Sequence, residues 1–509
     1  MKQRFRYVFW FLLPAAAAGA AGPAYADVTV SGNVSPNNPS DPWDLGSTPL
    51  VVSSVDEAGG GSVTVTRRGT LITAGAAVGR ALRSTGTVEI TGYGSTWTNR
   101  GVIEVGFPHA SGDVLIRRGA RVTTDDLVIT VSDLATGDVL VEGYDATLTV
   151  REDAYVGQDG SGRLTLRQGA RFSSDNTYIG LGACRYCDGT VRVEGSATRW
   201  VNTGELAVGG YGNGALLIDR GEVSSVNAEI VGFPDAGASH VNVTGWGGTW
   251  TNTGLLRIGD TYSPQEPARS GELTVGAYGT VVTAETEILS DLGLGFIEVG
   301  GVHASWINRG DVTILAARAE APSLLVERGG VVRLGGLLRA ATPPGYEDAP
   351  YLGPAVRLAG GALIAGAIEV EAGGFELAGG RLDTGSFVGD LANTQAGRLV
   401  VGEAHSGTGV AGSYSQGPGA ALRIAVAGPG AAPLLQIDGD VILDGALEVR
   451  PAGEPVSFEA GDSVVLLGWT GALAGTFAAV DIALPLAPGL AWDTSALYTT
   501  GEILVVPAS

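Results

Sequence analysis

A short pattern recurs along this 509-residue chain at nearly constant spacing: a small residue, one variable position, and then two apolar residues that flank another. The pattern begins at Gly61, Gly86, Gly112, Gly137, Gly162, Gly189, Gly214, Ser239, Gly271, Gly295, Pro322 and Pro354. Successive spacings are 25, 26, 25, 25, 27, 25, 25, 32, 24, 27 and 32 residues, and both long steps at 32 contain a Pro-rich segment. A period of this length indicates a stack of similar structural units.

Inside each unit, apolar and polar residues alternate in short runs that glycine interrupts, as in Val88 and Ile90 or Ile103 and Val105. This alternation predicts brief strands with one buried face. Three strands and three turns in ~25 residues fit one coil of a parallel β-helix, whose coils pair at ~4.8 Å. We therefore expect an all-β fold, a right-handed single-stranded parallel β-helix (solenoid) of ~25 residues per coil.

Four tryptophans are each followed two residues later by asparagine. These pairs are Trp97 and Asn99, Trp200 and Asn202, Trp250 and Asn252, and Trp306 and Asn308. They mark alternate coils, and Leu148 takes the place of tryptophan between the first two pairs. Strand alternation puts them in phase with the buried residues, so we expect the rings to fill the core and the amides to bond the backbone of a bend. The alternative is a ladder of exposed tryptophans that stack on sugar rings.

The N-terminus predicts export, because basic residues precede the apolar run YVFWFLLPAAAAGAAG and a small-residue cleavage site. We expect a signal peptide over residues 1–26 and an N-terminal cap over 27–58. The β-helix is expected over residues 59–410, in double-coil repeats of about 50 residues, and a C-terminal β-rich cap over 411–509. Caps are expected because open coils would expose strand edges.

Charge excludes some partners. Without the predicted signal peptide, the chain has 28 arginines, no lysine and 53 acidic residues, which gives a net charge of −25. Such a surface repels phosphate backbones, so we expect no nucleic-acid partner. After the signal peptide no stretch approaches the ~20 apolar residues of a membrane span, so no integral membrane segment is expected.

Two cysteines, Cys184 and Cys187, lie close together in GLGACRYCDG. In an oxidising compartment, this spacing favours a disulfide over a zinc site, which would need further ligands. A redox-active thiol pair is the alternative, although the strand and helix that flank such a pair in thioredoxin-like proteins are missing.

No catalytic, metal or cofactor site is predicted. The four histidines lie in different coils, and no metal-binding or phosphate-binding motif occurs. The enzyme alternative is a polysaccharide lyase or glycoside hydrolase, which would need carboxylates ~5 to 10 Å apart. Asp125 and Asp126 beside Asp153 come nearest to such an arrangement. We expect these carboxylates instead to be solvated charges that keep the rod soluble.

Length variation is concentrated in the turn that precedes each repeat position. Stacking would bring these turns together along one edge of the rod, where binding residues often gather. The candidate ligand residues on this edge are Phe107, Asp159, Tyr186, Tyr211, Phe233, Asp235, Asp260, Tyr262 and Tyr351. Aromatic rings beside carboxylates suit neutral glycans or cation-bridged polymers. The alternative is that turns far from the core tolerate insertions.

The compound pattern xxWxNxGxLxVGxxGxGxLxIxxGAxVxxxxxxIG, over residues 86–335, resembles the repeat of autotransporter (type V secretion) passengers and PEP-CTERM sorted proteins. The segment from FEAGDSVVLLGW to GEILVV is similar to the end of such passengers. The resemblance implies a secreted, surface-associated β-helix from a Gram-negative bacterium, often described as adhesin-like. Neither a translocator barrel nor a PEP-CTERM tail follows Ser509, so we predict export and leave the anchor open.

Together these features predict an extracellular, cell-surface or periplasmic protein that is not an enzyme. Its expected role is structural or adhesive, and glycans or other cell-surface and matrix components are its expected partners. A carbohydrate-active enzyme on the same scaffold remains the alternative. No cofactor is expected.

Overall fold

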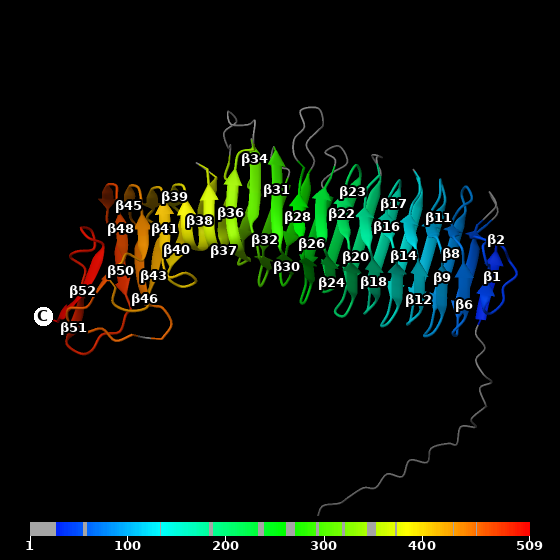
Figure 1. The fold of residues 1–509 in the computed structure, drawn as a ribbon, viewed down its shortest axis with the longest axis horizontal. Helices are drawn as coiled ribbons and strands as arrows, with labels where there is room; N and C mark the ends of the chain where they lie inside the picture. Colours follow the sequence, from blue (N-terminus) through cyan, green and yellow to red (C-terminus); the bar gives the residue numbers. More distant parts are fainter. Residues whose placement is uncertain are drawn as a thin grey trace, which may run out of the picture.

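The computed structural model describes residues 27–53, 59–132, 134–182, 187–232, 239–260, 270–291, 295–317, 321–343, 353–371, 374–430, 432–454 and 456–508. These residues form β-strands and no helix, in a parallel β-solenoid of about 14 turns with about 26 residues per coil. Figure 1 shows an elongated rod in which the coils follow the sequence from one end to the other. The predicted fold class is confirmed.

Each coil contributes one strand to each of three columns. The first column, after β1 (Asp27–Gly32), contains β5 (Gly61–Thr66), β8 (Thr85–Thr91), β11 (Ser111–Arg117), β14 (Thr136–Glu142), β17 (Ser161–Arg167), β20 (Asp188–Glu194), β23 (Asn213–Asp219), β26 (Ser239–Thr244), β29 (Gly271–Val275), β32 (Gly295–Gly300) and β35 (Leu324–Glu327). The repeat positions pair along this column, as in Gly112 with Gly137 and Ser239 with Gly271. Residues that recur at this spacing in the sequence therefore lie side by side in neighbouring coils.

The second column carries the tryptophan motif. It contains β3 (Trp43–Asp44), β6 (Thr70–Thr73), β9 (Thr96–Asn99), β12 (Arg121–Thr124), β15 (Thr147–Val150), β18 (Arg171–Ser174), β21 (Arg199–Asn202), β24 (Glu222–Ser225), β27 (Thr249–Asn252), β30 (Thr280–Thr283) and β33 (Ser305–Asn308). Large and smaller side chains occupy one buried position of this column. Trp200, for example, pairs with Val223, and Val223 pairs with Trp250.

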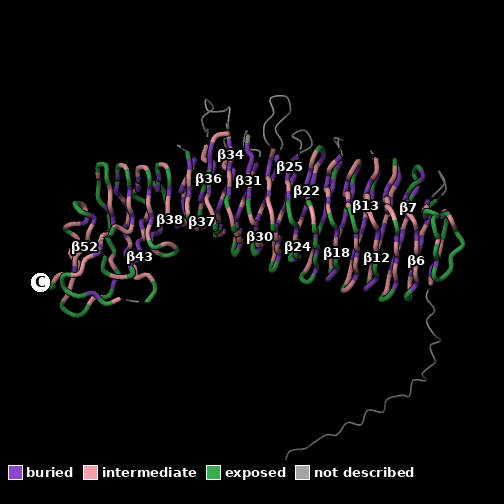
Figure 2. Tube along the Cα trace, in the orientation of Figure 1, coloured by how far each residue is buried: buried purple, intermediate pink, exposed green. Residues whose placement is uncertain are grey.

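The third column completes the coil. It contains β4 (Leu50–Val52), β7 (Ala76–Val78), β10 (Val102–Val105), β13 (Asp126–Ile129), β16 (Asp153–Val156), β19 (Asn176–Ile179), β22 (Glu205–Gly209), β25 (Asn227–Val231), β28 (Leu255–Ile258), β31 (Glu285–Asp291) and β34 (Val312–Ala317). Buried and outward residues alternate along the strands (Figure 2), so one apolar core runs along the inside of the rod.

The predicted N-terminal cap over 27–58 is partly a coil of the solenoid. Strand β1 pairs antiparallel with β5, and β2 (Val34–Ser35) pairs antiparallel with β4. Strands β3 and β4, however, pair parallel with β6 and β7. Trp43 consequently enters the buried tryptophan position, opposite Leu71.

Parallel stacking also continues beyond residue 411, where the sequence predicted a separate cap. Three long strands, β36 (Val331–Ala341), β37 (Val356–Val370) and β38 (Phe375–Val388), lead into further parallel coils. The coils after them contain β39 (Leu391–Asn393), β40 (Ala396–Val401), β41 (Thr408–Ala411), β42 (Tyr414–Gln416), β43 (Ala421–Val426), β44 (Leu435–Ile437), β45 (Val441–Leu443), β46 (Ala446–Pro451), β48 (Leu467–Trp469), β49 (Leu473–Gly475) and β50 (Ala479–Ile482).

The parallel pairings end at β48, β49 and β50, and an antiparallel sheet of β47 (Ser463–Val465), β52 (Glu502–Pro507) and β51 (Leu490–Asp493) follows. The repeat pattern recurs here from Gly397, Ala420 and Gly445, and Leu399, Leu422 and Leu447 pair in register from coil to coil.

Candidate functional site

The tryptophans and asparagines of the repeat form buried hydrogen-bond chains between coils. Trp250 donates from Nε1 to the Oγ of Ser225 at 3.0 Å, and that hydroxyl donates to Oδ1 of Asn252 at 2.8 Å. The amide of Asn252 then donates to the carbonyl of Gly254 at 3.0 Å. All four motif tryptophans are at most 1% exposed, which excludes them as a sugar-stacking ladder.

The hydroxyl group that links each tryptophan to its asparagine is not predicted from the sequence. Thr73, Ser174 and Thr283 take the place of Ser225 under Trp97, Trp200 and Trp306, in each case accepting from the indole and donating to the asparagine. Where Leu148 replaces tryptophan, the asparagine position holds Val150, and both are buried. Thr124, at the hydroxyl position one coil earlier, is hydrogen-bonded instead to the backbone carbonyl oxygens of Gly101 and Asp126.

The predicted ligand edge is described in part. Phe107, Asp159, Tyr211 and Asp260 lie in turns between the third and first columns, on alternate coils and thus roughly 10 Å apart along the rod. The guanidinium of Arg80 lies 5.9 Å from the centre of the Phe107 ring, and Tyr211 is exposed. Tyr186, Phe233, Asp235, Tyr262 and Tyr351 lie outside the described residues.

The same region contains the cysteines. Cys187 is buried and disulfide-bonded. Cys184 lies outside the described residues.

A row of exposed aromatic side chains lies at a different corner, in the turns between the first and second columns. Trp246 is 76% exposed, and its ring centre lies 5.6 Å from that of Tyr278, with an angle of 31° between the planes. Tyr278 lies 5.2 Å from His303, which belongs to the following coil. We call these three residues the aromatic row. The repeat does not predict this row, because the three residues do not occupy one position of it.

The turn one coil before Trp246 is shorter than the turn that carries Trp246. Two residues, Arg220 and Gly221, join β23 to β24, whereas residues 245–248 join β26 to β27 in the next coil. Arg220 forms an ion pair with Asp219 in which Nε lies 3.3 Å from both carboxylate oxygens and the terminal nitrogen lies 3.1 Å from Oδ2. This pair lies next to Gly245, the residue before Trp246. A Cβ added to Gly245 would lie 2.3 Å from the carboxylate of Asp219.

Carboxyl groups lie on the strands that lead into the same row. Burial, and then the neighbouring carboxylate of Glu327, raise the pKa of Glu298 above its usual value. Both side chains lie close to Gly300, at the start of the turn that carries His303. One coil earlier, the hydroxyl of Thr274 donates to Glu272 at 3.1 Å.

A shallow groove of about 490 Å³ lies on the outer face of the first column. Asp138 and Arg163 form an ion pair there at 3.4 Å, and the amide of Asn213 donates to Asp188 at 3.0 Å. His240 also lines the groove. Asp138 and Asp188 lie on β14 and β20, two coils apart. The groove therefore contains two carboxylates and a basic residue, and each of them contacts a side chain of a neighbouring coil.

The carboxylates singled out in the sequence lie on the third column and its turn. Asp125 forms an ion pair with Arg151 at 2.6 Å, and Asp126 accepts from the backbone N–H of Asp153 at 3.2 Å. Asp153 in turn accepts from the hydroxyl of Tyr155 at 3.1 Å. The structure thus brings the three together, in contacts that join one coil to the next.

Two tyrosines stack beside these acids. The rings of Tyr155 and Tyr178 lie 5.1 Å apart and 17° from parallel. Burial, followed by the charge of Asp153, raises the pKa of Tyr155 to about 12. The pKa of Tyr178 is also raised, first by burial and then by Glu205.

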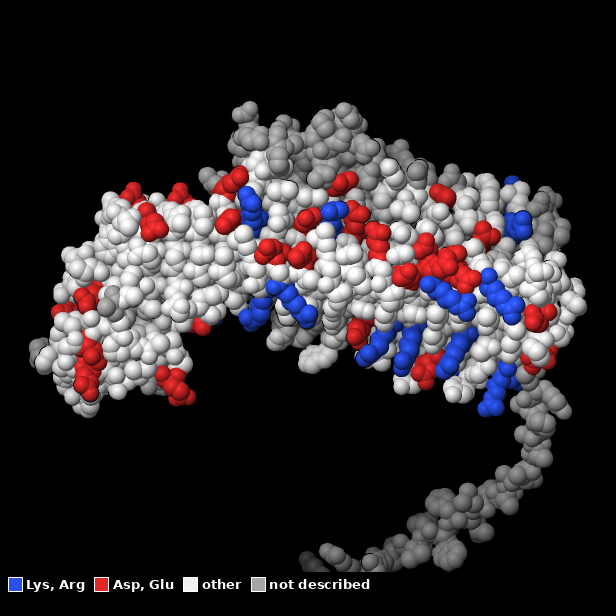
Figure 3. Space-filling view, in the orientation of Figure 1, with Lys and Arg blue, Asp and Glu red and all other residues white. Residues whose placement is uncertain are grey.

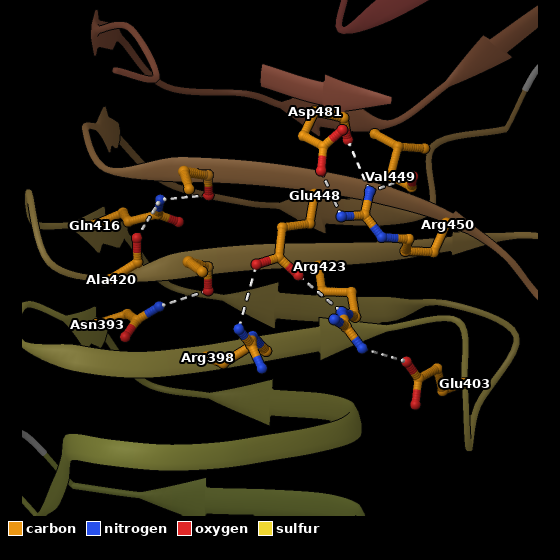
Figure 4. Close-up of polar contacts among 12 residues, drawn as sticks. Asn393, Arg398, Glu403, Gln416, Ala420, Arg423, Glu448, Val449, Arg450 and Asp481 are labelled. Atoms are coloured by element: carbon orange, nitrogen blue, oxygen red, sulfur yellow. Dashed lines mark hydrogen bonds and ion pairs between the residues drawn. The ribbon is translucent and has the colours of Figure 1, made fainter. Parts of the chain in front are cut away.

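Ion pairs also connect the C-terminal coils. Glu448 accepts from Arg398 at 3.2 Å and from Arg423 at 2.9 Å, while Arg450 contacts Asp481 at 2.5 Å (Figure 4). In the N-terminal half, basic side chains gather along one edge of the face in Figure 3, with acidic residues next to them. The charges therefore stabilise neighbouring coils in ladders.

In the described part of the chain, no three histidine, cysteine, aspartate or glutamate side chains gather to hold a metal ion. Among the same residues, no helix is long and apolar enough to cross a membrane.

The fold defines the chain as a parallel β-solenoid protein. No protein-family model matches it. The chain is 27% identical over 268 residues to the uncharacterized lipoprotein YdeK of Escherichia coli (strain K12). That similarity covers 50% of this chain and 19% of the relative, so the chain matches about a fifth of the relative's length.

Proposed function

We propose that this chain is an exported, non-enzymatic rod of the cell envelope, with a structural or adhesive role in cell-surface or matrix contact. Its scaffold supports this role, because a 45-stranded sheet around one continuous core holds its outward side chains at fixed intervals. The predicted signal peptide supports export, and the name of the E. coli relative, a lipoprotein, supports a place in the cell envelope.

The observation that carries an adhesive role is the aromatic row. Large exposed rings that cluster, unlike single exposed side chains, mark sites of contact with other molecules. Trp246 is the most exposed of the three, and Tyr278, which itself contacts His303, lies against it at an angle of 31°. A rigid rod that carries such a row has the properties of a contact surface.

The groove on the first column favours a second candidate function, a carbohydrate-active enzyme. Asp138 and Asp188 lie two coils and two register positions apart, roughly 10 Å along the rod and about 7 Å along the strand. This is wider than the usual spacing of paired carboxylates in hydrolysis, so the candidate rests on the residue types that line the groove. Asp125, Asp126 and Asp153 favour it less, because each is bound into a contact between coils. We rank the adhesive role first.

Attachment of the producing cells tests the first candidate. Cells without the gene are expected to attach less to surfaces coated with their own extracellular matrix, and the full-length chain supplied in trans is expected to restore attachment. Unchanged attachment would refute an adhesive role. In parallel, release of reducing or unsaturated sugars from polysaccharides, abolished by Asp138→Asn or Asp188→Asn, would establish the enzyme instead.

A further inference from the structure

We infer that the free face of the Trp246 indole and the adjacent Asp219–Arg220 ion pair form a binding site for a hexopyranose unit of a neutral glycan. This inference rests on the proposed surface role and names the ligand class of one site within it.

One face of the Trp246 indole is free. Tyr278, from the next coil, covers one face of Trp246, yet the residue remains 76% exposed. Because Tyr278 belongs to the following coil, we infer that the open face of the indole is on the side of the preceding coil, whose turn consists of Arg220 and Gly221 alone. The turn that carries Trp246 is two residues longer than that turn. Sugars bind to open aromatic faces through the apolar C–H side of the pyranose ring.

The Asp219–Arg220 ion pair lies beside the turn that carries Trp246. Asp219 and Arg220 are about half exposed, at 47% and 56% for their side chains, and hold each other in a fork-shaped ion pair. Such a pair offers acceptors and donors in a fixed geometry, which suits neighbouring hydroxyl groups. The absence of a side chain at Gly245 lets this pair lie directly at the base of the Trp246 turn.

The Trp246 indole is supported by rings from the two following coils. Tyr278 and His303 both adopt left-handed backbone conformations, with φ of 62° and 59°. Glycine is the residue that suits this conformation, and Gly247 occupies the corresponding place in the Trp246 turn. Asp145 and Ala197 adopt the same conformation at the same place of their turns, so it belongs to the repeated turn, and this turn places the two rings behind Trp246.

Charge selects a neutral glycan. The chain carries 53 acidic residues, and Glu272, Glu298 and Glu327 lie on the strands beside the row. These carboxyl groups would repel uronic acid polymers, nucleic acids and anionic lipids. A neutral pyranose avoids that repulsion. It can still pack on the Trp246 ring and form hydrogen bonds with the Asp219–Arg220 pair.

Affinity electrophoresis of the full chain through gels with soluble polysaccharides tests the site. Hydroxyethyl cellulose and galactomannan are the neutral probes, and alginate is the anionic one. We expect at least one neutral probe and not alginate to retard the wild-type chain. Trp246→Ala is expected to weaken that retardation about tenfold, the size of effect that one aromatic contact and its buried area produce.

Tyr144→Ala is the matched control. Tyr144 is 70% exposed and occupies the place of Trp246 in its own turn, but its ring lies on Gly169 of the next coil rather than in a stack. Retardation should be unchanged in this variant. An equal loss in Tyr144→Ala and Trp246→Ala would overturn the assignment, as would retardation of neither neutral probe or of Trp246→Ala as strongly as wild type.

Tyr278→Gly separates support of the indole from stability of the fold. Glycine suits φ of 62°, so the melting temperature should stay at or above the wild-type value while glycan retardation falls severalfold. Asp145→Gly is the control, since Asp145 has the same φ of 62° in a turn without stacked rings. Retardation as strong as wild type in Tyr278→Gly would remove the role of the stack.

Two readouts distinguish this inference from the proposed function. If Trp246→Ala restores cell attachment in the deletion strain as well as wild type, the adhesive role stands and this site is wrong. If wild type restores no attachment but binds neutral glycan through Trp246, the site stands and the adhesive role is wrong. A dimer that becomes monomeric in Trp246→Ala would identify a second copy of the chain as the occupant and overturn the inference.

Discussion

The indole Nε1 of Trp250 donates to the hydroxyl of Ser225, one coil earlier, at a distance of 3.0 Å, and the same hydroxyl donates to Asn252. The hydroxyl thus joins the two residues that define the repeat. All three side chains are buried, so each depends on the others for its hydrogen bonds. The repeat is in this sense a polar unit embedded in an apolar core.

Replacing the shared hydroxyl is therefore expected to cost more than one hydrogen bond. Ser225→Ala leaves the indole N–H and the asparagine oxygen without partners, and we expect the free energy of unfolding in urea to fall by about 3 kcal/mol. Ser225→Thr should be tolerated, because Thr73 and Thr283 have the same role in other coils. Ser224→Ala, on the outward face of the strand, should change stability by less than about 0.5 kcal/mol. Equal effects of the two alanine variants would contradict the network.

The period of the solenoid and the burial of its tryptophans follow from the alternation of apolar residues, which the sequence displays directly. The shared hydroxyls do not stand out, because Ser174 or Ser225 in isolation resembles any strand serine. They recur about 25 residues before the asparagines, in phase with the core, and that phase was the available signal. Because these hydroxyl residues recur with the period of the repeat, a comparison of the coils identifies them.

The aromatic row was beyond the sequence for a physical reason. Trp246 and Tyr278 occupy different positions of their turns, GWGG and GAYG, so no period relates them. Their contact depends on side-chain conformation and on the relative lengths of neighbouring turns. The predicted edge, by contrast, rested on insertions that mark where chain length varies, which is a property of tolerance rather than of chemistry.

Glycine at the repeat positions gives a second prediction. An added Cβ on Gly162 would lie 2.3 Å from the backbone nitrogen of Gly157, because the preceding turn passes directly over this strand. Gly162→Ala is therefore expected to lower the free energy of unfolding by about 3 kcal/mol, measured in urea. Gly366→Ala is the control, since no atom lies within 4 Å of its added Cβ. A similar loss at Gly366 would show that glycine matters here for other reasons than space.

The buried carboxylate of Asp383 gives a third prediction. It contacts Arg381 at 2.8 Å and Nδ1 of His405 at 3.2 Å, and its side chain is 1% exposed. Asp383→Asn should lower the free energy of unfolding by about 2 kcal/mol, less than for a fully enclosed pair, because Arg381 keeps Glu403 as a partner at 2.8 Å. Asp481→Asn breaks an exposed pair with Arg450 and should cost less than about 1 kcal/mol. The order of the two effects is the result to check, and the reverse order would count against a buried network.

The stacked tyrosines give a prediction about alkaline pH. Burial and Asp153 raise the pKa of Tyr155 to about 12, from an ordinary value of 10.0. Between these two values the unfolded chain releases the phenol proton and the folded chain retains it, so this group makes stability fall as pH rises from about 10 to about 12. The contribution is fully present below pH 10, and Tyr155→Phe should make this decline shallower in urea denaturation at pH 9 to 12.

An ultraviolet titration of phenolate formation measures the same shift directly. The difference between wild type and Tyr155→Phe should show one tyrosine with a midpoint near 12. Asp153→Asn should move that midpoint toward 10 without reaching it, because burial is the larger cause and remains. A midpoint near 10 in the wild-type difference would mean that the hydroxyl of Tyr155 is open to water and that the stack with Tyr178 does not shield it.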